Sequence, residues 1–410
     1  MIGAGAAGLM AAYRAARRGG RILLVEKANK VGVKILMSGG TRCNVTHDTN
    51  ADGIMAAFGG NGSFLRQVLA AFGPRDVREM LRENGVPTQV EETGKVFPTS
   101  NRAIDVRDAL LRQAIVAGVE IRCGTAVRDI TRIESMWQVS TGDGCLNAPQ
   151  LIITVGGRSY PGCGTTGDGY AWMAALGHRI VPTRPALVPL LGGYEWSKSL
   201  SGLTLDDVEL SVVPSAGKRK RLDQRRSSLL FTHFGFSGPA AMDVSRTITA
   251  ASPMTDVQLI LDPLPDVPFT DLESWLAECR RVAGKQQIAN ILSERIPRRL
   301  AEALLVHAGA PVDTKISELA ASPQRKLLES LRGVALPITG TRGFDKAEVT
   351  AGGVDLRDVD PRTMSSRRQP GIFLAGELLD LDGWIGGYNF QSAFSTGYVA
   401  GESVPLGLNS

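Results

Sequence analysis

The stretch Gly3-Ala4-Gly5-Ala6-Ala7-Gly8 decides the fold class of this 410-residue chain, because it matches the pattern G-x-G-x-x-G. Glycines at this spacing form a tight turn and let the backbone approach a pyrophosphate at a helix N-terminus. The residues that follow fit this context: we expect an alanine-rich helix over residues 9–18, a stop at Gly19-Gly20 and a buried strand over residues 21–25. The sequence therefore predicts an α/β dinucleotide-binding unit at the start of the chain.

An acidic residue lies where such a unit needs one. Glu26 ends the predicted strand 18 residues after Gly8, a distance at which its carboxylate can accept the ribose hydroxyls. The strand before Gly3 would usually need about five or six residues, and only Met1 and Ile2 precede that glycine. We therefore expect either a start codon that was assigned too late or a truncated chain.

Composition excludes several classes of protein. Hydrophobic residues make up 43% and charged residues 21% of the chain, which rules out a disordered chain or a coiled coil. The net charge is +5, with an isoelectric point near 9.0, which permits an anionic dinucleotide without requiring nucleic acid. The basic excess is concentrated in residues 218–226, which lack interleaved aromatic side chains. A solvated hairpin tip is the favoured interpretation, and nucleic acid is an unlikely partner.

The cysteines and histidines favour a reducing compartment. None of the five cysteines forms a Cys-x-x-Cys pair, and the four histidines show no ligand spacing, so we expect neither disulfides nor a metal site. The chain has no apolar run of the roughly 18 residues that a membrane helix needs and no signal-peptide pattern at its start. These features predict a cytoplasmic protein that does not bind membranes.

Two further regions indicate which dinucleotide is bound. Residues 119–155 are expected to form a run of short strands, and a β-meander inside a dinucleotide-binding fold is typical of FAD domains of the glutathione-reductase type. Near the C-terminus, residues 370–377 are expected to form a strand that ends in Gly376-Glu377. Gly386-Gly387-Tyr388-Asn389 then opens a helix over residues 390–400, with Asn389 as its N-cap. The backbone N–H groups of such a helix start would favour a negatively charged reduced flavin.

Several long motifs together resemble a family of bacterial NAD(P)/FAD-dependent oxidoreductases of the aminoacetone-oxidase-like or bile-acid-reductase-like type. The resemblance covers nearly the whole chain. The motifs that carry it are KILMSGGTRCNVT (34–46), GGRSYPGCGTTGDGY (156–170), PALVPL (185–190), LFTHFGFSGP (230–239), TAGGV (350–354) and residues 376–401.

The resemblance implies a non-covalent FAD and a set of residues that bind it. By similarity, Glu26 would hold the adenosine ribose, residues 38–44 the pyrophosphate and flavin side, Ala126-Val127 the adenine, Gly376-Glu377 the ribityl chain and phosphates, and residues 387–389 the flavin ring. The expected cofactor-binding residues are Gly3, Gly5, Ala6, Ala7, Gly8, Glu26, Lys27, Lys34, Ser38, Gly39, Gly40, Arg42, Cys43, Asn44, Ala126, Val127, Gly156, Gly157, Gly376, Glu377, Gly386, Gly387, Tyr388 and Asn389.

The expected architecture is a Rossmann-like FAD-binding domain assembled from both chain ends, residues 1–190 and 343–410. A β-rich subdomain (191–265) and a helical subdomain (266–342) are inserted between these parts. A second G-x-G-x-x-G at residues 162–167 has no acid about 20 residues later and follows Pro161, so it does not predict a second nucleotide domain.

Four possibilities remain open from the sequence, and no catalytic residue is assigned. The preferred one is an oxidoreductase in which NAD(P)H, docking transiently, reduces FAD for hydride transfer to a small conjugated or carbonyl substrate. The alternatives are a flavin amine oxidase that uses oxygen and a flavoprotein that acts on nucleic acid through the basic run at residues 218–226. A flavin-binding protein without turnover would fail to bleach with any donor.

Overall fold

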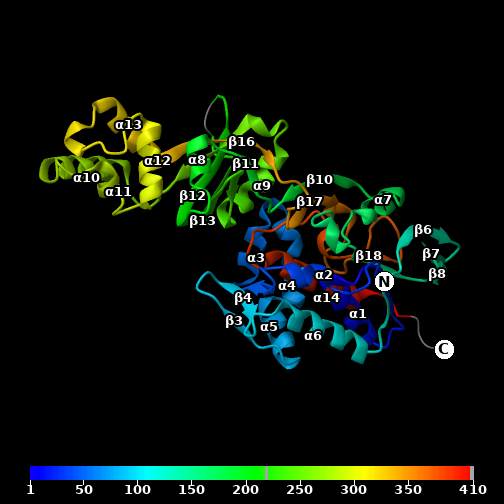
Figure 1. Ribbon diagram of the computed structural model, residues 1–410. Coiled ribbons are helices and arrows are strands. Elements are labelled where there is room, and N and C mark those ends of the chain that lie inside the picture. The colour runs from blue at the N-terminus through cyan, green and yellow to red at the C-terminus, as the bar shows by residue number, and fades with distance from the viewer. Residues whose placement is uncertain (218–219, 407–410) are drawn as a thin grey trace. The chain divides into compact units, whose positions relative to one another are not determined.

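The computed structural model describes residues 1–217 and 220–406, which divide into two compact units (Figure 1). The first unit joins residues 1–185 to the chain from residue 347 onward, and the second consists of residues 186–346. The boundaries expected from the sequence lay at residues 190 and 343. The ranges 191–265 and 266–342, expected as two subdomains, fall in one unit.

A parallel sheet forms the centre of the first unit. The strand β1 (Leu23–Val25) pairs with β5 (Glu120–Arg122), and β9 (Leu151–Ile153) pairs with β18 (Ile372–Leu374). Ile2 joins the two pairs through single parallel bridges to β1 and β9. All three residues of β9 and of β18 are buried, as parallel strands covered on both faces usually are. Strands from the two ends of the chain thus lie side by side.

Two helices from opposite chain ends cross closely on this sheet. Alanines fill the buried face of α1 (Ala6–Arg17), and glycines bring α14 (Tyr388–Ser403) near it. A Cβ at Gly397 would meet the backbone of Ala7, and one at Gly401 would meet that of Ala11. Because residues ascend together along this contact, α1 and α14 run in the same direction (Figure 1).

The run of strands expected over residues 119–155 is divided between two sheets. Only β6 (Val127–Ile133), β7 (Met136–Thr141) and β8 (Gly144–Ala148) form an antiparallel meander. The flanking strands β5 and β9 belong instead to the parallel sheet. Local β-propensity could not distinguish the two, since sheet membership depends on partners distant in sequence.

Shorter elements complete the first unit. One three-stranded sheet has the order β2-β4-β3, and β10 pairs with β17. These elements are α2 (Val33–Met37), β2 (Thr46–His47), α3 (Ala51–Ala57), α4 (Arg66–Ala71), α5 (Pro74–Glu83), β3 (Thr88–Val90), β4 (Lys95–Pro98), α6 (Ala103–Val116), α7 (Asp168–Ala175), β10 (Ile180–Ala186) and β17 (Val349–Val354).

The second unit is a closed barrel with helices beside it. Its strand order is β11-β14-β13-β12-β15-β16, and β16 closes the barrel by pairing with both β15 and β11. The expectation that residues 266–342 are helical is wrong at its end, because β16 (Val334–Thr341) is a strand. The other strands are β11 (Leu190–Gly192), β12 (Thr204–Pro214), β13 (Asp223–Thr232), β14 (Gly235–Ser237) and β15 (Val257–Asp262). The helices are α8 (Glu195–Ser199), α9 (Pro239–Ala250), α10 (Phe269–Val282), α11 (Ile288–Leu292), α12 (Arg298–Ala308) and α13 (Ala321–Gly333).

The basic run lies at the β12–β13 connection, and its first residues, 218 and 219, fall outside the described residues. Three of its described arginines pair with acids of the second unit, the first of them Arg221 with Glu209 on β12 at 3.6 Å. Arg225 Nε donates to Asp243 at 2.6 Å, and Arg226 pairs with Asp207 and Asp266. This pairing reduces the positive charge that the run could offer to a polyanion.

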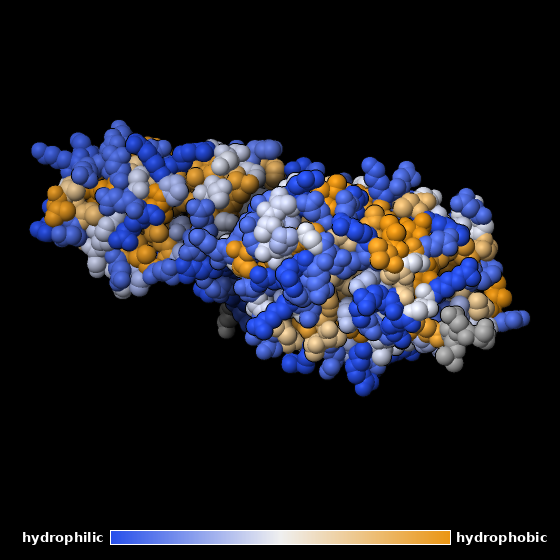
Figure 2. Space-filling model, turned by 90° about the horizontal axis from the view of Figure 1, so that it is seen from below, coloured by the Kyte–Doolittle hydropathy of each residue, from blue (hydrophilic) through white to orange (hydrophobic). Residues whose placement is uncertain are grey.

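Within the described residues, no helix is long and apolar enough to cross a membrane. Figure 2 shows one face of the molecule, on which hydrophilic residues (blue) surround scattered apolar patches (orange).

Candidate functional site

The start of α1 has the properties of an anion site. Its N-cap is Gly5, no side chain caps it, and its first turn holds no acidic residue. The free N–H groups of a helix start attract negative charge. Gly5 has an ordinary extended backbone (φ −79°, ψ −167°), and a Cβ there would meet nothing within 4 Å. Neither backbone strain nor packing therefore requires glycine at this position, whereas a phosphate lying against the helix would.

Glu26 lies beside this loop, as the spacing predicts. Its carboxylate accepts hydrogen bonds from the backbone N–H groups of Ala4 (2.7 Å) and Ala28 (2.9 Å). The backbone of Thr125 donates to the Glu26 carbonyl at 2.9 Å, so the expected adenine residues Ala126 and Val127 follow next to this acid. The ribose and adenine contacts proposed from the sequence thus lie together.

Lys27 tethers the second glycine-rich motif to the first. Its Nζ donates to Asp168 Oδ2 at 2.6 Å, and Thr166 shares the same carboxylate. Burial would raise the pKa of Asp168, but these hydrogen bonds outweigh burial and lower the pKa. The loop over residues 162–167 therefore lies beside the adenosine end of the predicted site.

The loop over residues 38–44 concentrates left-handed backbone. Gly39, Gly40, Thr41 and Cys43 all have positive φ angles, between 55° and 70°. Successive N–H groups in such conformations can form an anion-binding concavity. Cys43 is fully buried, and burial raises the pKa of its thiol to about 12, so the thiol stays protonated at neutral pH.

Arg42 points from this loop to the neighbouring β3–β4 hairpin. Its guanidinium pairs with Glu91 at 2.8 Å and lies 4.0 Å from the centre of the Phe97 ring. Asn44 holds the same hairpin, since its Oδ1 accepts from the Val96 N–H at 3.2 Å. These contacts fix the loop from one side.

The start of α14 forms the other end of the predicted site. Gly387 (φ 91°) is its N-cap, so the prediction that Asn389 caps this helix is wrong. Asn389 instead lies inside the helix and exchanges hydrogen bonds with the backbone of Gly383 at 2.8 and 2.9 Å. Tyr388 stacks on His47 with ring centroids 4.7 Å apart. No side chain caps this helix start, and no acid lies in its first turn.

The parallel course of α1 and α14 sets the spacing of their two N-termini. Gly397 lies against Ala7, and nine residues separate Gly397 from Tyr388. Since α1 begins one residue before Ala7, the two starts differ by eight residues, or about 12 Å at 1.5 Å per residue. An extended dinucleotide with its pyrophosphate at α1 and its flavin at α14 fits this offset.

A polar network links four segments next to the glycine loops. The Glu377 carboxylate accepts hydrogen bonds from Lys34 Nζ (2.6 Å), Ser159 Oγ (2.7 Å) and the Thr350 N–H (2.8 Å). Gly157 is required here, because a Cβ would meet the Thr350 side chain. The oxygens of the Glu377 carboxylate thus accept hydrogen bonds from groups of the protein. Its segment would contact the ribityl chain through Gly376 and the backbone.

Sequence reasoning gave no role to Ser159, Thr350 or His47. Each lies in or beside a stretch that carried the resemblance: Ser159 in GGRSY, Thr350 in TAGGV, and His47 directly after residue 46. Asp380 lies three residues after Glu377. Its carboxylate accepts from the Gly352 N–H at 3.0 Å and from Asn61 at 3.2 Å, and burial raises its pKa.

A parallel sheet built from both chain ends, with two glycine-capped helix starts at this offset, defines an FAD-dependent oxidoreductase. The chain belongs to the family described as HI0933-like protein Rossmann domain, whose pattern matches residues 1–403. The predicted fold class and FAD cofactor are thereby confirmed.

Similar proteins differ in what they act on. The chain is 33% identical to the ribosomal RNA dihydrouridine synthase of Escherichia coli (strain K12), over 98% of this chain and 97% of that protein. It is 30% identical to the 3-dehydro-bile acid delta(4,6)-reductase of Clostridium scindens, over 98% of each chain. Among solved structures, 3-ketosteroid-delta4-(5alpha)-dehydrogenase from Rhodococcus jostii RHA1 matches with 14% identity and a TM-score of 0.54, covering 98% of this chain and 95% of that one. The relative that acts on ribosomal RNA weighs against our expectation that nucleic acid is an unlikely partner.

Proposed function

We propose that the protein is an FAD-dependent reductase that saturates the C5=C6 bond of a uracil ring in RNA. The observation that carries this proposal is the 33% identity to a ribosomal RNA dihydrouridine synthase along almost the full length of both chains. The sequence alone favoured a small conjugated substrate, and the new proposal keeps that chemistry while placing the conjugated bond in RNA.

The two named activities have one reaction in common. Making dihydrouridine from uridine adds a hydride to C6 and a proton to C5, and C5=C6 is conjugated to the C4 carbonyl. A delta(4,6)-reductase, as its name says, also reduces a C=C bond of a 3-dehydro, and therefore 3-oxo, compound. In both cases the hydride reaches a carbon conjugated to a carbonyl, and negative charge develops on the carbonyl oxygen.

Bound FAD, once reduced, supplies the hydride for this chemistry. The protein's own groups would position the FAD and stabilise its negative charge. The Ala6–Gly8 turn of α1 would bind the pyrophosphate, Glu26 the ribose, and the start of α14 the flavin edge. The partial positive charge at the start of α14 favours the anionic reduced state. Lys34, with its partner Glu377, would hold the loops around the cofactor in place.

NAD(P)H is the proposed reductant, and it would dock transiently. The loop over residues 162–167 is tied to Lys27 and Asp168 and precedes α7 directly. It thus belongs to the FAD-binding unit rather than opening a second nucleotide domain. A cytoplasmic location likewise stays a prediction.

The test is a pair of measurements on the purified flavoprotein. Anaerobic addition of NADPH or NADH should bleach the flavin spectrum. The reduced enzyme should then convert uridine in unmodified, transcribed ribosomal RNA to dihydrouridine, detected by mass spectrometry of the digested nucleosides as a gain of two hydrogens.

Two other results would overturn the proposal. Turnover of a delta(4,6)-3-ketosteroid, with no change in RNA, would indicate a small-molecule enone reductase. Bleaching only by an amine, with peroxide formed on aeration, would indicate the amine oxidase.

A further inference from the structure

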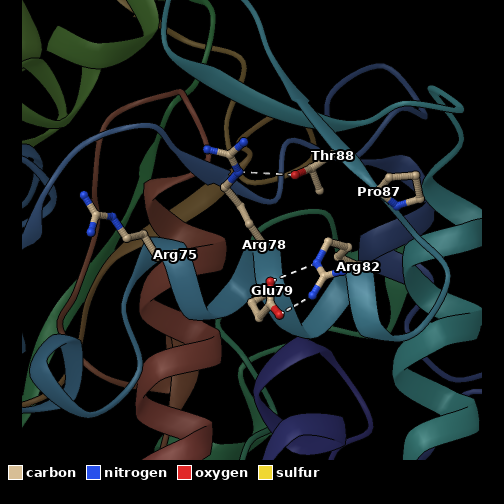
Figure 3. A pocket seen from close by; sticks show the side chains of 6 residues that line it. All are labelled: Arg75, Arg78, Glu79, Arg82, Pro87 and Thr88. Carbon is tan, nitrogen blue, oxygen red and sulfur yellow. Dashed lines mark hydrogen bonds and ion pairs between the residues drawn. The ribbon is translucent and has the colours of Figure 1, made fainter.

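An arginine-lined pocket lies on α5, outside the predicted cofactor site. Its volume is about 290 Å³, and it is lined by Arg75, Arg78, Glu79, Arg82, Pro87 and Thr88. Figure 3 shows that the three arginines leave successive turns of α5, with Arg78 reaching up to Thr88. The opposite face of the helix is apolar and buried, so packing orients the arginines outward.

The charges in this pocket are only partly neutralised. Arg82 pairs with Glu79, and Arg78 pairs with Asp48 at 2.9 Å while its Nε donates to Thr88 Oγ1 at 3.3 Å. A guanidinium has five N–H donors, so each paired arginine keeps donors for a further ligand. Arg75 is exposed, and the part of the chain that the structure describes gives it no ion-pair or hydrogen-bond partner.

Two further acids, Asp76 and Glu83, lie on α5 outside the pocket lining. Asp76 accepts the Gly73 N–H at 2.7 Å, at the N-terminus of the helix. Glu83 acts electrostatically on Arg17 as well as on Arg82. Of the pocket's own lining, three residues are cationic and one, Glu79, is anionic. The pocket is therefore suited to an anion with several oxygen acceptors.

The pocket is connected to the flavin end of the site through β2. Asp48, the partner of Arg78, follows His47 in the chain. His47 stacks on Tyr388, and its Nδ1 lies 3.1 Å from the Gly386 carbonyl oxygen, at the start of α14. Asp48 and His47 would thus stand between an anion bound by Arg78 and Tyr388, one of the residues proposed to hold the flavin ring.

We propose that this pocket binds a backbone phosphate of the RNA whose uracil is reduced. Arginine forks match phosphate oxygens, and side chains one turn apart on a helix lie about 5–6 Å apart, so the row can follow a strand. The inference rests on the proposed function and extends it. Phosphate contacts would fix the register of the RNA, and the flavin site would select the base. Arg75, Arg78 and Arg82 are positioning residues in this scheme.

The test measures RNA binding and turnover by the FAD-loaded protein. The variants are Arg75→Gln and Arg75→Glu, because Arg75 has no protein partner within the described residues and its loss should not disturb folding. The control is Arg281→Gln, which removes one arginine, with 71% of its side chain exposed, from α10 outside the pocket.

Arg75→Gln should weaken binding of a transcribed ribosomal RNA fragment about threefold at low salt and make the salt dependence shallower by about one phosphate contact. Arg75→Glu should weaken binding by roughly tenfold or more. The KM for RNA should rise while kcat, flavin content and bleaching by NAD(P)H stay unchanged. Arg281→Gln should match the wild type in every measurement.

The outcomes separate the two proposals. If the wild type forms dihydrouridine and Arg75→Glu binds and modifies RNA equally well, the pocket inference is wrong and the function stands. If RNA binding depends on Arg75 but no dihydrouridine forms, the pocket inference holds and the function is wrong. If the wild type neither binds nor modifies RNA, both are wrong.

Discussion

Replacing Gly5 by alanine should weaken cofactor binding while leaving the folding of the protein almost unchanged. A Cβ at Gly5 would meet no protein atom within 4 Å and would need no backbone change, since φ is −79°. At an N-cap, alanine is worse than glycine by up to about 1 kcal/mol, but it gains about 0.4–1 kcal/mol by restricting the unfolded chain. The stability of the FAD-free protein should therefore change by less than about 1 kcal/mol.

FAD binding should change far more. The methyl group would occupy the space beside the first N–H groups of α1, where we expect the pyrophosphate. Losing about two hydrogen bonds to a charged group, at roughly 1.5–3 kcal/mol each, amounts to about 3–6 kcal/mol. At 1.4 kcal/mol per factor of ten, the Kd for FAD should rise roughly 10²- to 10⁴-fold.

The assay is a titration of FAD-free protein with FAD, followed by flavin fluorescence, together with thermal unfolding of the same preparation. Gly60→Ala is the matched control, because a Cβ at Gly60 also meets nothing within 4 Å and its φ is not strained. The reasoning is refuted if Gly5→Ala keeps the wild-type Kd, or if Gly60→Ala loses FAD equally.

Three further predictions concern stability and reactivity. Gly387→Ala should destabilise the fold by at least about 1–2 kcal/mol, because φ is 91° and the added Cβ would clash with the Thr46 carbonyl rather than enter the space proposed for the flavin. Denaturant unfolding of the FAD-free protein measures this loss, and a variant as stable as the wild type would contradict it. Burial alone would raise the pKa of Asp358, but hydrogen bonds from two arginines outweigh burial and lower the pKa. The ionised Asp358 carboxylate therefore stabilises the fold at pH values above its ordinary pKa of 3.8, and this stabilisation is lost as the pH falls below that value. Unfolding measured against pH should show a shallower acid loss in Asp358→Asn, and an unchanged slope would count against this assignment. Cys43 is buried and has a pKa of about 12, so it should resist a thiol reagent that labels the exposed Cys123. Mass spectrometry of the labelled native protein measures both reactions, and equal labelling rates would contradict the prediction.

Local sequence indicated which two features of the candidate site lie close together at the start of α1. The glycine loop and Glu26 depend on spacing within one βαβ unit, and the Glu26 carboxylate does lie beside the loop, bonded to the Ala4 N–H. The start of α14 was placed two residues late, because asparagine is a stronger N-cap by preference than glycine. The positive φ of Gly387 decides the true start, and no local preference reveals that angle.

Contacts between residues far apart in the chain could not be predicted from sequence patterns. Lys34 and Glu377 are 343 positions apart, and neither spacing nor periodicity indicates that they share a hydrogen bond. The strand β16 was missed for a similar reason. It follows α13 directly, and its role in closing the barrel depends on β11, far back in the chain.

The nesting of one unit inside the other has a consequence for biosynthesis. Residues 186–346 leave the ribosome as one continuous segment, so the barrel and its helices can fold before the surrounding unit is complete. The parallel sheet is complete only after β18 has been made, and the start of α14 joins that of α1 only after residue 388. FAD bound at both helix starts, as we propose, would stabilise these late-forming contacts by mass action.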